Sequence, residues 1–267
     1  MSTLWKRALA TTTIALVAGF GMTACSTGDN GSTTTKTTQS QTEQAPKASG
    51  VMTADDFTQR MNDAQYKAGS AHFTQSTEVS GQKLETSGDM VLNKDAAKMR
   101  MSMSMPGGME IRIVDGEVYM NLGQLTENKF FKAPKDGSNP IFAQLDQSLS
   151  QADLGKQLEV FRAALKDFKA DEGADTIDGV KTTKYTLTLD TKKMLASSAT
   201  EVPAEALKQL GDTVTYELYA GPDDLPRRMV MNMAGTAMTM DFSQWGSAAE
   251  VTAPSADQIT DKAPAGL

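Results

Sequence analysis

The sequence predicts an α+β protein built on one strongly curved antiparallel sheet, a half-barrel of about ten strands with helices on its concave face. Short segments in which every second residue is apolar follow one another along the chain and are joined by tight turns. This pattern is typical of an antiparallel meander with one solvated face. Segments of helical periodicity interrupt the strands in the second half of the chain. The apolar faces of so many strands need a cover, and the interrupting helices can supply it.

The first 24 residues are expected to be a lipoprotein signal peptide. Lys6 and Arg7 form a basic start, and the apolar run that follows is too short for a comfortable membrane span. The run ends in small residues directly before Cys25, the only cysteine of the chain, and this junction resembles a bacterial lipobox. A lipobox implies cleavage before Cys25 and a diacylglyceryl group on its sulfur, whose two chains suffice for stable anchoring. An ordinary signal peptide followed by a chance cysteine is the alternative.

Residues 25–50 are predicted to be the acylated cysteine followed by a disordered tether. Residues 26–50 are rich in Ser, Thr and Gln and contain no large apolar residue, so they cannot contribute to a core. A flexible segment of this length reaches about 25–30 Å from end to end. One folded domain is therefore expected over residues 51–267, and it must be stable without a disulfide.

The charge balance limits the partners of this domain. Removing Lys6 and Arg7 with the signal peptide leaves 24 basic against 33 acidic residues, a net charge of −9. No basic stripe is present, so nucleic acid is not an expected partner. For the same reason, attachment to the membrane should come from the anchor at Cys25 and not from a polybasic surface.

The folded domain is predicted to begin with an amphipathic helix followed by five strands. Thr53 with Asp56 three residues later is a helix-start signal, and apolar residues recur at helical spacing up to Gly69. A turn at Pro106–Gly108 and a two-residue hairpin at Asp115–Gly116 separate later strands. The five strands are expected at residues 71–79, 83–92, 98–105, 109–114 and 117–122.

The second half is predicted to alternate helices and strands. Residues 139–168 are expected to be mainly helical, because Leu154, Leu158, Phe161 and Leu165 lie on one stripe. Residues 176–190 should form two strands joined at Asp178–Gly179.

Residues 191–210 are expected to be helical again, with Pro203 in a first turn and Gly211 just after the last one. Three strands should close the chain, at residues 213–220, 227–235 and 237–242.

The order and spacing of four segments, with the lipobox and the Ser/Thr tether, resemble the LppX/LprG-type lipoproteins of actinobacteria. The segments are DGEVYMNL at 115–122, DGVKTTKYTLTLD at 178–190, DFSQWG at 241–246 and APSADQI at 253–259. This family is similar in fold to the LolA/LolB lipoprotein carriers, and the resemblance covers roughly residues 53–260. It implies a half-barrel whose hydrophobic cavity holds acylated lipids or glycolipids for transport to the outer envelope. Cys25 is the one residue whose role is carried over, and this chain departs from the family in its richness in methionine.

Catalysis is not predicted. His72 is the only histidine, and no GxSxG segment is present, so neither a Ser-His-Asp nor a Cys-His arrangement is expected. The paired acids at 55–56, 171–172 and 223–224 lie in helix starts or turns, where carboxylates cap helices or face water. Calcium-loop spacing and nucleotide-binding glycine patterns are absent from the sequence. We expect no enzymatic activity, no cofactor and no metal ion.

Methionine marks the segment to which a function can be assigned. Met99, Met101, Met103 and Met105 occupy every second position and so share one face of a strand. Methionine adapts to different apolar shapes, which favours the lining of a lipid cavity, but it is also an ordinary core residue. Thioethers are also soft ligands suited to copper(I). Successive positions on one face lie about 6.6 Å apart, however, so one ion could bind two of them only through bent side chains.

We interpret the methionine row as the wall of a lipid cavity. The predicted lining is Met99, Met101, Met103, Ile111, Ile113, Leu158, Phe161, Leu187, Tyr216, Leu218, Met229, Met231, Met233, Met238 and Met240. The helical segments at 139–168 and 191–210 would be its gates.

The sequence thus predicts a monomeric, non-catalytic lipoprotein on the extracytoplasmic face of the cell membrane, anchored through Cys25. It would bind acylated lipid or glycolipid and carry it within the cell envelope. A cell-envelope scaffold or sensor without lipid cargo, and a copper(I)-binding protein, are the alternatives.

Overall fold

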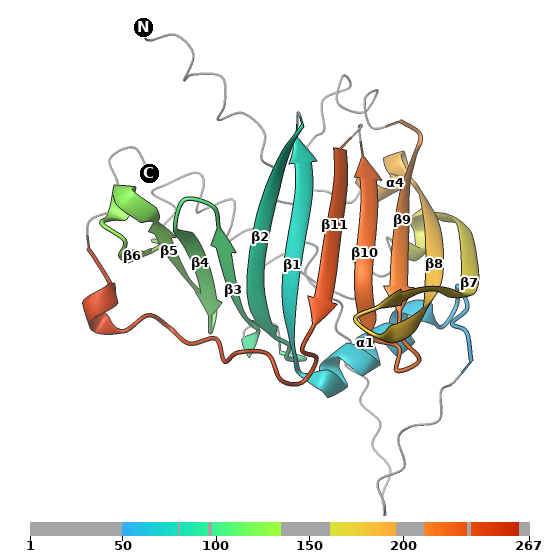
Figure 1. The fold of residues 1–267 in the computed structure, drawn as a ribbon, viewed down its shortest axis with the longest axis horizontal. Helices are drawn as coiled ribbons and strands as arrows, with labels where there is room; N and C mark the ends of the chain where they lie inside the picture. The colour runs from blue at the N-terminus through green and yellow to red at the C-terminus, as the bar shows by residue number, and fades with distance from the viewer. Residues whose placement is uncertain are drawn as a thin grey trace, which may run out of the picture.

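The structure is a computed structural model that describes residues 50–79, 81–95, 98–134, 161–195, 211–233 and 236–261. One antiparallel sheet of eleven strands dominates it (Figure 1). The strand order is β6-β5-β4-β3-β2-β1-β11-β10-β9-β8-β7, so the sheet is not closed and β6 and β7 are its two edges. The predicted fold class, an α+β protein built on one antiparallel half-barrel sheet of about ten strands, is confirmed, and the sheet has eleven strands.

The elements of the first half follow the predicted order. They are α1 Phe57–Ala68, β1 Ser70–Val79, β2 Gln82–Val91, β3 Arg100–Met105, β4 Met109–Val114, β5 Glu117–Leu122, the short helix η2 Gly123–Thr126 and β6 Phe130–Lys132. The elements of the second half are β7 Leu165–Ile177, β8 Val180–Asp190, α4 Thr191–Leu195, β9 Thr213–Ala220, β10 Pro226–Met233, β11 Thr236–Ser243 and the short helix η3 Ala256–Gln258.

Two predicted hairpins owe their turns to aspartate–glycine pairs. Asp115 and Gly116 have φ angles of 52° and 74°, and Asp178 and Gly179 have φ angles of 49° and 77°. Positive φ at both central residues is the geometry of the two-residue turns whose twist matches that of paired strands. These turns join β4 to β5 and β7 to β8.

The predicted helix at 139–168 is wrong at its C-terminal end. Residues 161–164 are helical, but Leu165 begins β7, which pairs with β8 along its length. A register shift pairs Leu165 with Leu189 and Phe168 with Leu187, so two residues three apart lie on the same face of the strand. Such a bulge imitates helical spacing in the sequence. Residues 165–168 belong to the sheet, so they are not part of a movable gate.

The other predicted helices are tested only in part. The start of the predicted helix at 191–210 is helical and forms α4. The rest of it lies outside the described residues, at 196–210, and so does Pro203. The same holds for residues 135–160, which include Leu154 and Leu158. The N-terminal helix begins at Phe57, four residues later than the Thr53 signal suggested. The Thr53 backbone N–H donates to Asp56 Oδ1 over 2.6 Å in the turn before it. Strand β6 was not predicted.

Helix α1 packs on one face of the sheet, at the end formed by β7, β8 and β9. Phe57 and Met61 of the helix form a buried cluster with Tyr185, Leu187, Leu218 and Ala220. The ring centroid of Phe57 lies 5.3 Å from that of Phe168 and 5.3 Å from that of Tyr185. We call the face covered by α1 the inner face.

Polar contacts hold α1 and the segment before it in place. Arg60 binds Asp224 through two hydrogen bonds, Nε to Oδ2 at 3.1 Å and Nη2 to Oδ1 at 2.8 Å. Arg60 Nη2 also donates to the Gly50 carbonyl oxygen over 2.9 Å. The backbone N–H of Met52, a fully buried residue, donates to the Tyr185 hydroxyl over 3.1 Å. The folded domain is therefore fixed at its N-terminal start to the β8 end of the inner face.

Candidate functional site

The strand register shows how far the apolar inner face extends. Residues directly opposite each other on paired strands point to the same side of a sheet, so one inner-face residue identifies its neighbours from strand to strand. One row runs Leu187, Tyr216, Met231, Met238 and Thr77 across β8, β9, β10, β11 and β1. The next row runs Tyr185, Leu218, Met229, Met240 and Gln75 across the same strands.

The inner face continues through the other half of the sheet. Here the rows run Met90, Met101, Ile113 and Val118, and Gly88, Met103, Ile111, Met120 and Phe131. Phe73 of β1 lies opposite both Phe242 of β11 and Gly88 of β2 and so connects the two halves. The apolar surface therefore extends across all eleven strands, and Phe73 is its apolar link at β1.

The two ends of this surface are packed, while its middle is half-exposed. The cluster around α1 buries Tyr185, Leu187 and Leu218 at one end, and a second cluster buries Val118 and Phe131 at the other. Between them, Met231 is only 5% exposed, but the other described methionines of this part of the face are partly buried: Met101, Met103, Met229, Met238 and Met240. Leu84 on β2 is 51% exposed. The middle of the inner face is the part that can contact a further apolar molecule.

The structure brings most of the predicted lining together on this face, in two groups. Met101 and Met103 lie opposite Ile113 and Ile111. The second group comprises Leu187, Tyr216, Leu218, Met229, Met231, Met238 and Met240, which are linked by direct pairing across β8 to β11.

Four predicted residues have a different or untested position. Phe161 packs against the cluster around α1. Met99 precedes β3 and is not part of its paired ladder. The side chain of Met233 and all of Leu158 lie outside the described residues, so their place in the lining stays a prediction.

Sequence reasoning missed several inner-face residues, because a strand pattern does not show which strands are neighbours. Phe73, Met90, Met120, Phe131 and Phe168 all lie on this face. Their apolar alternation was a usable signal for Phe73, Met90 and Met120. Phe131 lies in β6, which was not predicted. Phe168 was missed because the bulge in β7 gives it a helix-like spacing from Leu165.

A short polar stripe crosses the middle of the apolar face. Gln75 and Thr77 of β1 and Thr86 of β2 are all half-buried on the inner side, Gln75 opposite Thr86. The Gln75 Nε2 group lies 3.4 Å from Thr77 Oγ1. These side chains can offer hydrogen bonds to a polar group of a bound molecule without leaving the face.

The tyrosines of the inner face are kept neutral. Burial raises the pKa of Tyr216 and of Tyr185. The Tyr185 hydroxyl accepts the Met52 N–H, and the Tyr216 hydroxyl lies 3.7 Å from Met194 Sδ of α4. Both rings therefore contribute apolar surface, and each hydroxyl group has a polar partner.

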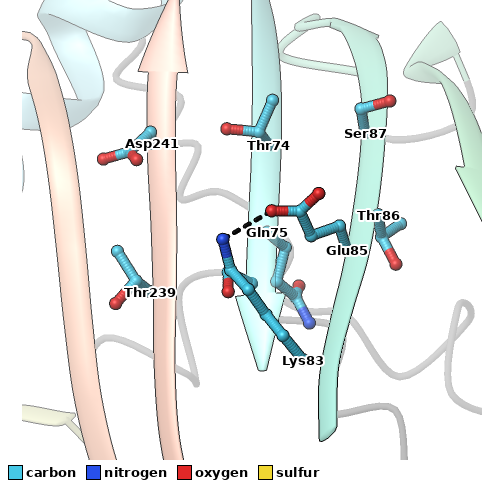
Figure 2. Close-up of a pocket in the computed structure, with 9 residues that line it drawn as sticks. Thr74, Gln75, Lys83, Glu85, Thr86, Ser87, Thr239 and Asp241 are labelled. Atoms are coloured by element: carbon cyan, nitrogen blue, oxygen red, sulfur yellow. Dashed lines mark ion pairs between the residues drawn. The ribbon is translucent and has the colours of Figure 1, made fainter. Parts of the chain in front are cut away.

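The opposite, outer face is polar and contains a different hollow. It measures about 380 Å³ and lies over β1, β2 and β11, where Lys83 and Glu85 form a 2.6 Å ion pair (Figure 2). Its lining residues are Thr74, Gln75, Ser76, Lys83, Glu85, Thr86, Ser87, Thr239 and Asp241, of which Gln75 and Thr86 belong by register to the inner-face rows and the others to the outer face. It has no large apolar side chain, so it is not the lipid cavity that the sequence predicts.

Several charged groups of the described residues form pairs between neighbouring strands. His72 Nδ1 lies 2.9 Å from Asp89 Oδ1 across β1 and β2, and Arg228 Nε donates to Asp241 Oδ1 over 2.6 Å across β10 and β11. Within the described ranges, no group of three or more His, Cys, Asp or Glu side chains is placed to hold a metal ion. No helix in the described part of the chain is long and apolar enough to cross a membrane.

Comparisons with known proteins give matches among solved structures only. No protein-family model and no curated protein matches the chain. The Mycobacterium tuberculosis lipoprotein LppX matches at 15% identity and a TM-score of 0.49, covering 74% of this chain and 98% of its own.

LprF from Mycobacterium bovis matches at 15% identity and a TM-score of 0.45, covering 75% and 97% of the two chains. The Pseudomonas aeruginosa MucA/MucB complex matches at 17% identity and a TM-score of 0.39, covering 77% of this chain and 59% of that one. The structures to which this chain is similar thus include LppX, one of the two lipoproteins that give their names to the family its sequence resembles.

Proposed function

We propose that this protein is a cell-envelope lipoprotein, anchored through Cys25, that binds the acyl chains of a lipid or glycolipid on its inner face and carries it within the envelope. The single observation that supports this function is the continuous apolar inner face, packed at both ends and half-exposed in the middle. An extended apolar surface of this kind on a folded domain is typical of a binding site.

The binding energy would come from removing acyl chains from water. Each methylene that is fully buried contributes roughly 0.8 kcal/mol. Ten buried methylenes would contribute about 8 kcal/mol before the cost of ordering the chain is subtracted. No strong polar contact is needed for retention.

The composition of the middle of the face suits a variable ligand. Met101, Met103, Met229, Met238 and Met240 are flexible and polarisable, so they can repack around chains of different length or branching. The polar stripe of Gln75, Thr77 and Thr86 would form hydrogen bonds with an ester or hydroxyl group of the lipid. Burying such a group among methionines without a hydrogen bond would be unfavourable.

The tether would join the anchor to a defined point of the domain. Gly50 and Met52 are held by Arg60 and Tyr185 at the α1 end of the inner face. A tether reaching about 25–30 Å would keep this end of the face within a short distance of the membrane surface from which lipid is taken.

Native mass spectrometry of the whole chain, produced in an actinobacterial host, tests this function. We expect an added mass that releases acyl lipid on extraction. A bare protein mass that stays unchanged after incubation with envelope lipids would reject the carrier function and favour the scaffold or sensor.

A matched pair of variants tests the face itself. Met103→Lys places a charge on the half-exposed middle of the inner face, whereas Ser104→Lys places the same charge on the next residue, which is exposed on the outer side. We expect lipid to be lost from the first variant and retained by the second. Equal retention by both would show that the lipid binds elsewhere.

A further inference from the structure

The β10–β11 hairpin carries two directly opposed pairs of methionines. Met229 lies opposite Met240, and Met231 lies opposite Met238. Both pairs are on the inner face and are separated by one residue along each strand. The backbone positions of these four methionines therefore form the corners of one rectangle, and we call the four residues the methionine quartet.

The dimensions of the rectangle suit a single small ion. Opposed Cβ atoms lie about 5 Å apart, and successive positions on one face about 6.6 Å apart, so the centre is about 4 Å from each Cβ in projection. A methionine sulfur is two bonds beyond its Cβ and has three rotatable bonds to orient it. All four sulfurs can therefore turn toward one point above the centre. Spacing along a single strand does not offer this arrangement.

The surroundings of the quartet select the type of ion. On the inner face its neighbours are Leu218 and Tyr216 of β9 and Gln75 and Thr77 of β1. The ion pair of Arg228 with Asp241, on the same two strands, lies on the outer face. Among the described residues, the inner-face positions around the quartet thus offer neutral thioethers and no carboxylate, imidazole or thiolate, a ligand set that suits copper(I) and is poor for zinc, calcium or magnesium.

We propose that the methionine quartet, Met229, Met231, Met238 and Met240, binds one copper(I) ion. This site is a function beyond lipid binding, although it lies on the same face. It does not depend on a lipid being carried.

The other methionine-rich part of the sheet provides a matched control. Met90 lies opposite Met101, and Met105 lies opposite Met109. These pairs are not adjacent, because between them Met103 lies opposite Gly88 and Ile111. Five methionines lie there, Met90, Met101, Met103, Met105 and Met109, but Met103 has no methionine opposite it, so no four of them form a rectangle of two adjacent opposed pairs.

The test uses the whole chain with the sulfur of Cys25 blocked, either by its lipid anchor or by alkylation, so that it cannot bind the metal itself. Silver(I), which needs no reducing agent, is added and bound ions are counted by native mass spectrometry. Copper(I) is then supplied anaerobically from a chromophoric copper(I) complex, and its transfer to the protein is followed by absorbance.

Two fourfold leucine variants distinguish the site from general methionine content. M229L/M231L/M238L/M240L should lose the bound ion, and M90L/M101L/M105L/M109L should keep it. Leucine is similar in size to methionine, so both variants are expected to fold, and circular dichroism checks this.

The proposal is rejected if the unsubstituted chain takes up no silver(I) or copper(I), or if both variants lose or keep the ion equally. If the quartet variant misfolds, the single variant Met240→Leu takes its place and should weaken binding; unchanged affinity would overturn the proposal. The lipid content of the same protein sample is measured by extraction. Uptake of the ion by a chain that carries no acyl lipid, with loss of the ion in the quartet variant, separates this proposal from the proposed function.

Discussion

The hydrogen-bonded ion pair of Arg60 with Asp224 should hold α1 on the inner face. Both side chains are 19% exposed, and the pair is joined by bonds of 2.8 and 3.1 Å. Hydrogen bonds to charged groups at such positions contribute about 1.5–3 kcal/mol, and removing one partner leaves the other charge partly desolvated. The guanidinium also holds the Gly50 carbonyl. We therefore expect Arg60→Ala to lower the free energy of unfolding by about 2–3 kcal/mol.

A double-mutant cycle isolates the contribution of the pair. Asp224 has a φ angle of 61°, a conformation that asparagine tolerates as well, so Asp224→Asn removes the charge with little backbone strain. Urea unfolding of the single and double variants should give a coupling energy of about 1–3 kcal/mol. Arg60→Lys keeps the positive charge but cannot form the bidentate hydrogen bonds to Asp224, so it should lose part of the coupling energy.

The loosened helix should also be visible locally. Without the ion pair, amide hydrogen exchange in α1 should become faster than in β8 and β9, because the helix can open without unfolding the sheet. A coupling energy within about 0.5 kcal/mol of zero, with unchanged exchange in α1, would show that the apolar contacts of Phe57 and Met61 hold the helix by themselves.

Two further changes test how the inner face is supported. Tyr185→Phe removes the acceptor of the buried Met52 N–H. We expect it to lower the free energy of unfolding, measured in urea, by about 1–3 kcal/mol. A smaller change would mean that this N–H finds another partner. Gly179→Ala introduces a Cβ that meets no atom within 4 Å, so any loss reflects only its φ of 77°. We expect about 1–2 kcal/mol in the same assay, and no loss would show that the β7–β8 turn can change conformation.

Local patterns in the sequence were sufficient for much of the fold. The alternation in residues 109–122 and the Asp115–Gly116 turn predicted β4 and β5, because strand period and turn geometry depend on adjacent residues only. Period-two spacing likewise placed Met101 and Met103 on one face. The β7 bulge could not be recognised, because a register shift is defined by the partner strand and leaves a helix-like spacing in the chain itself.

The site depends on pairings that no local pattern contains. β1 lies next to β11, with His72 opposite Ser243, so the first and last strands of the domain are joined in the middle of the sheet. This pairing places the two methionine-rich segments on one continuous face and sets the polar stripe of Gln75 and Thr77 between them.

The sequence by itself determined the strand periods, the hairpin turns and the apolar character of the face, because each follows from side chains a few residues apart. Only the tertiary structure decided which methionines stand opposite one another. The register across β10 and β11 depends on backbone hydrogen bonds between the strands. It places Met229 opposite Met240 and Met231 opposite Met238.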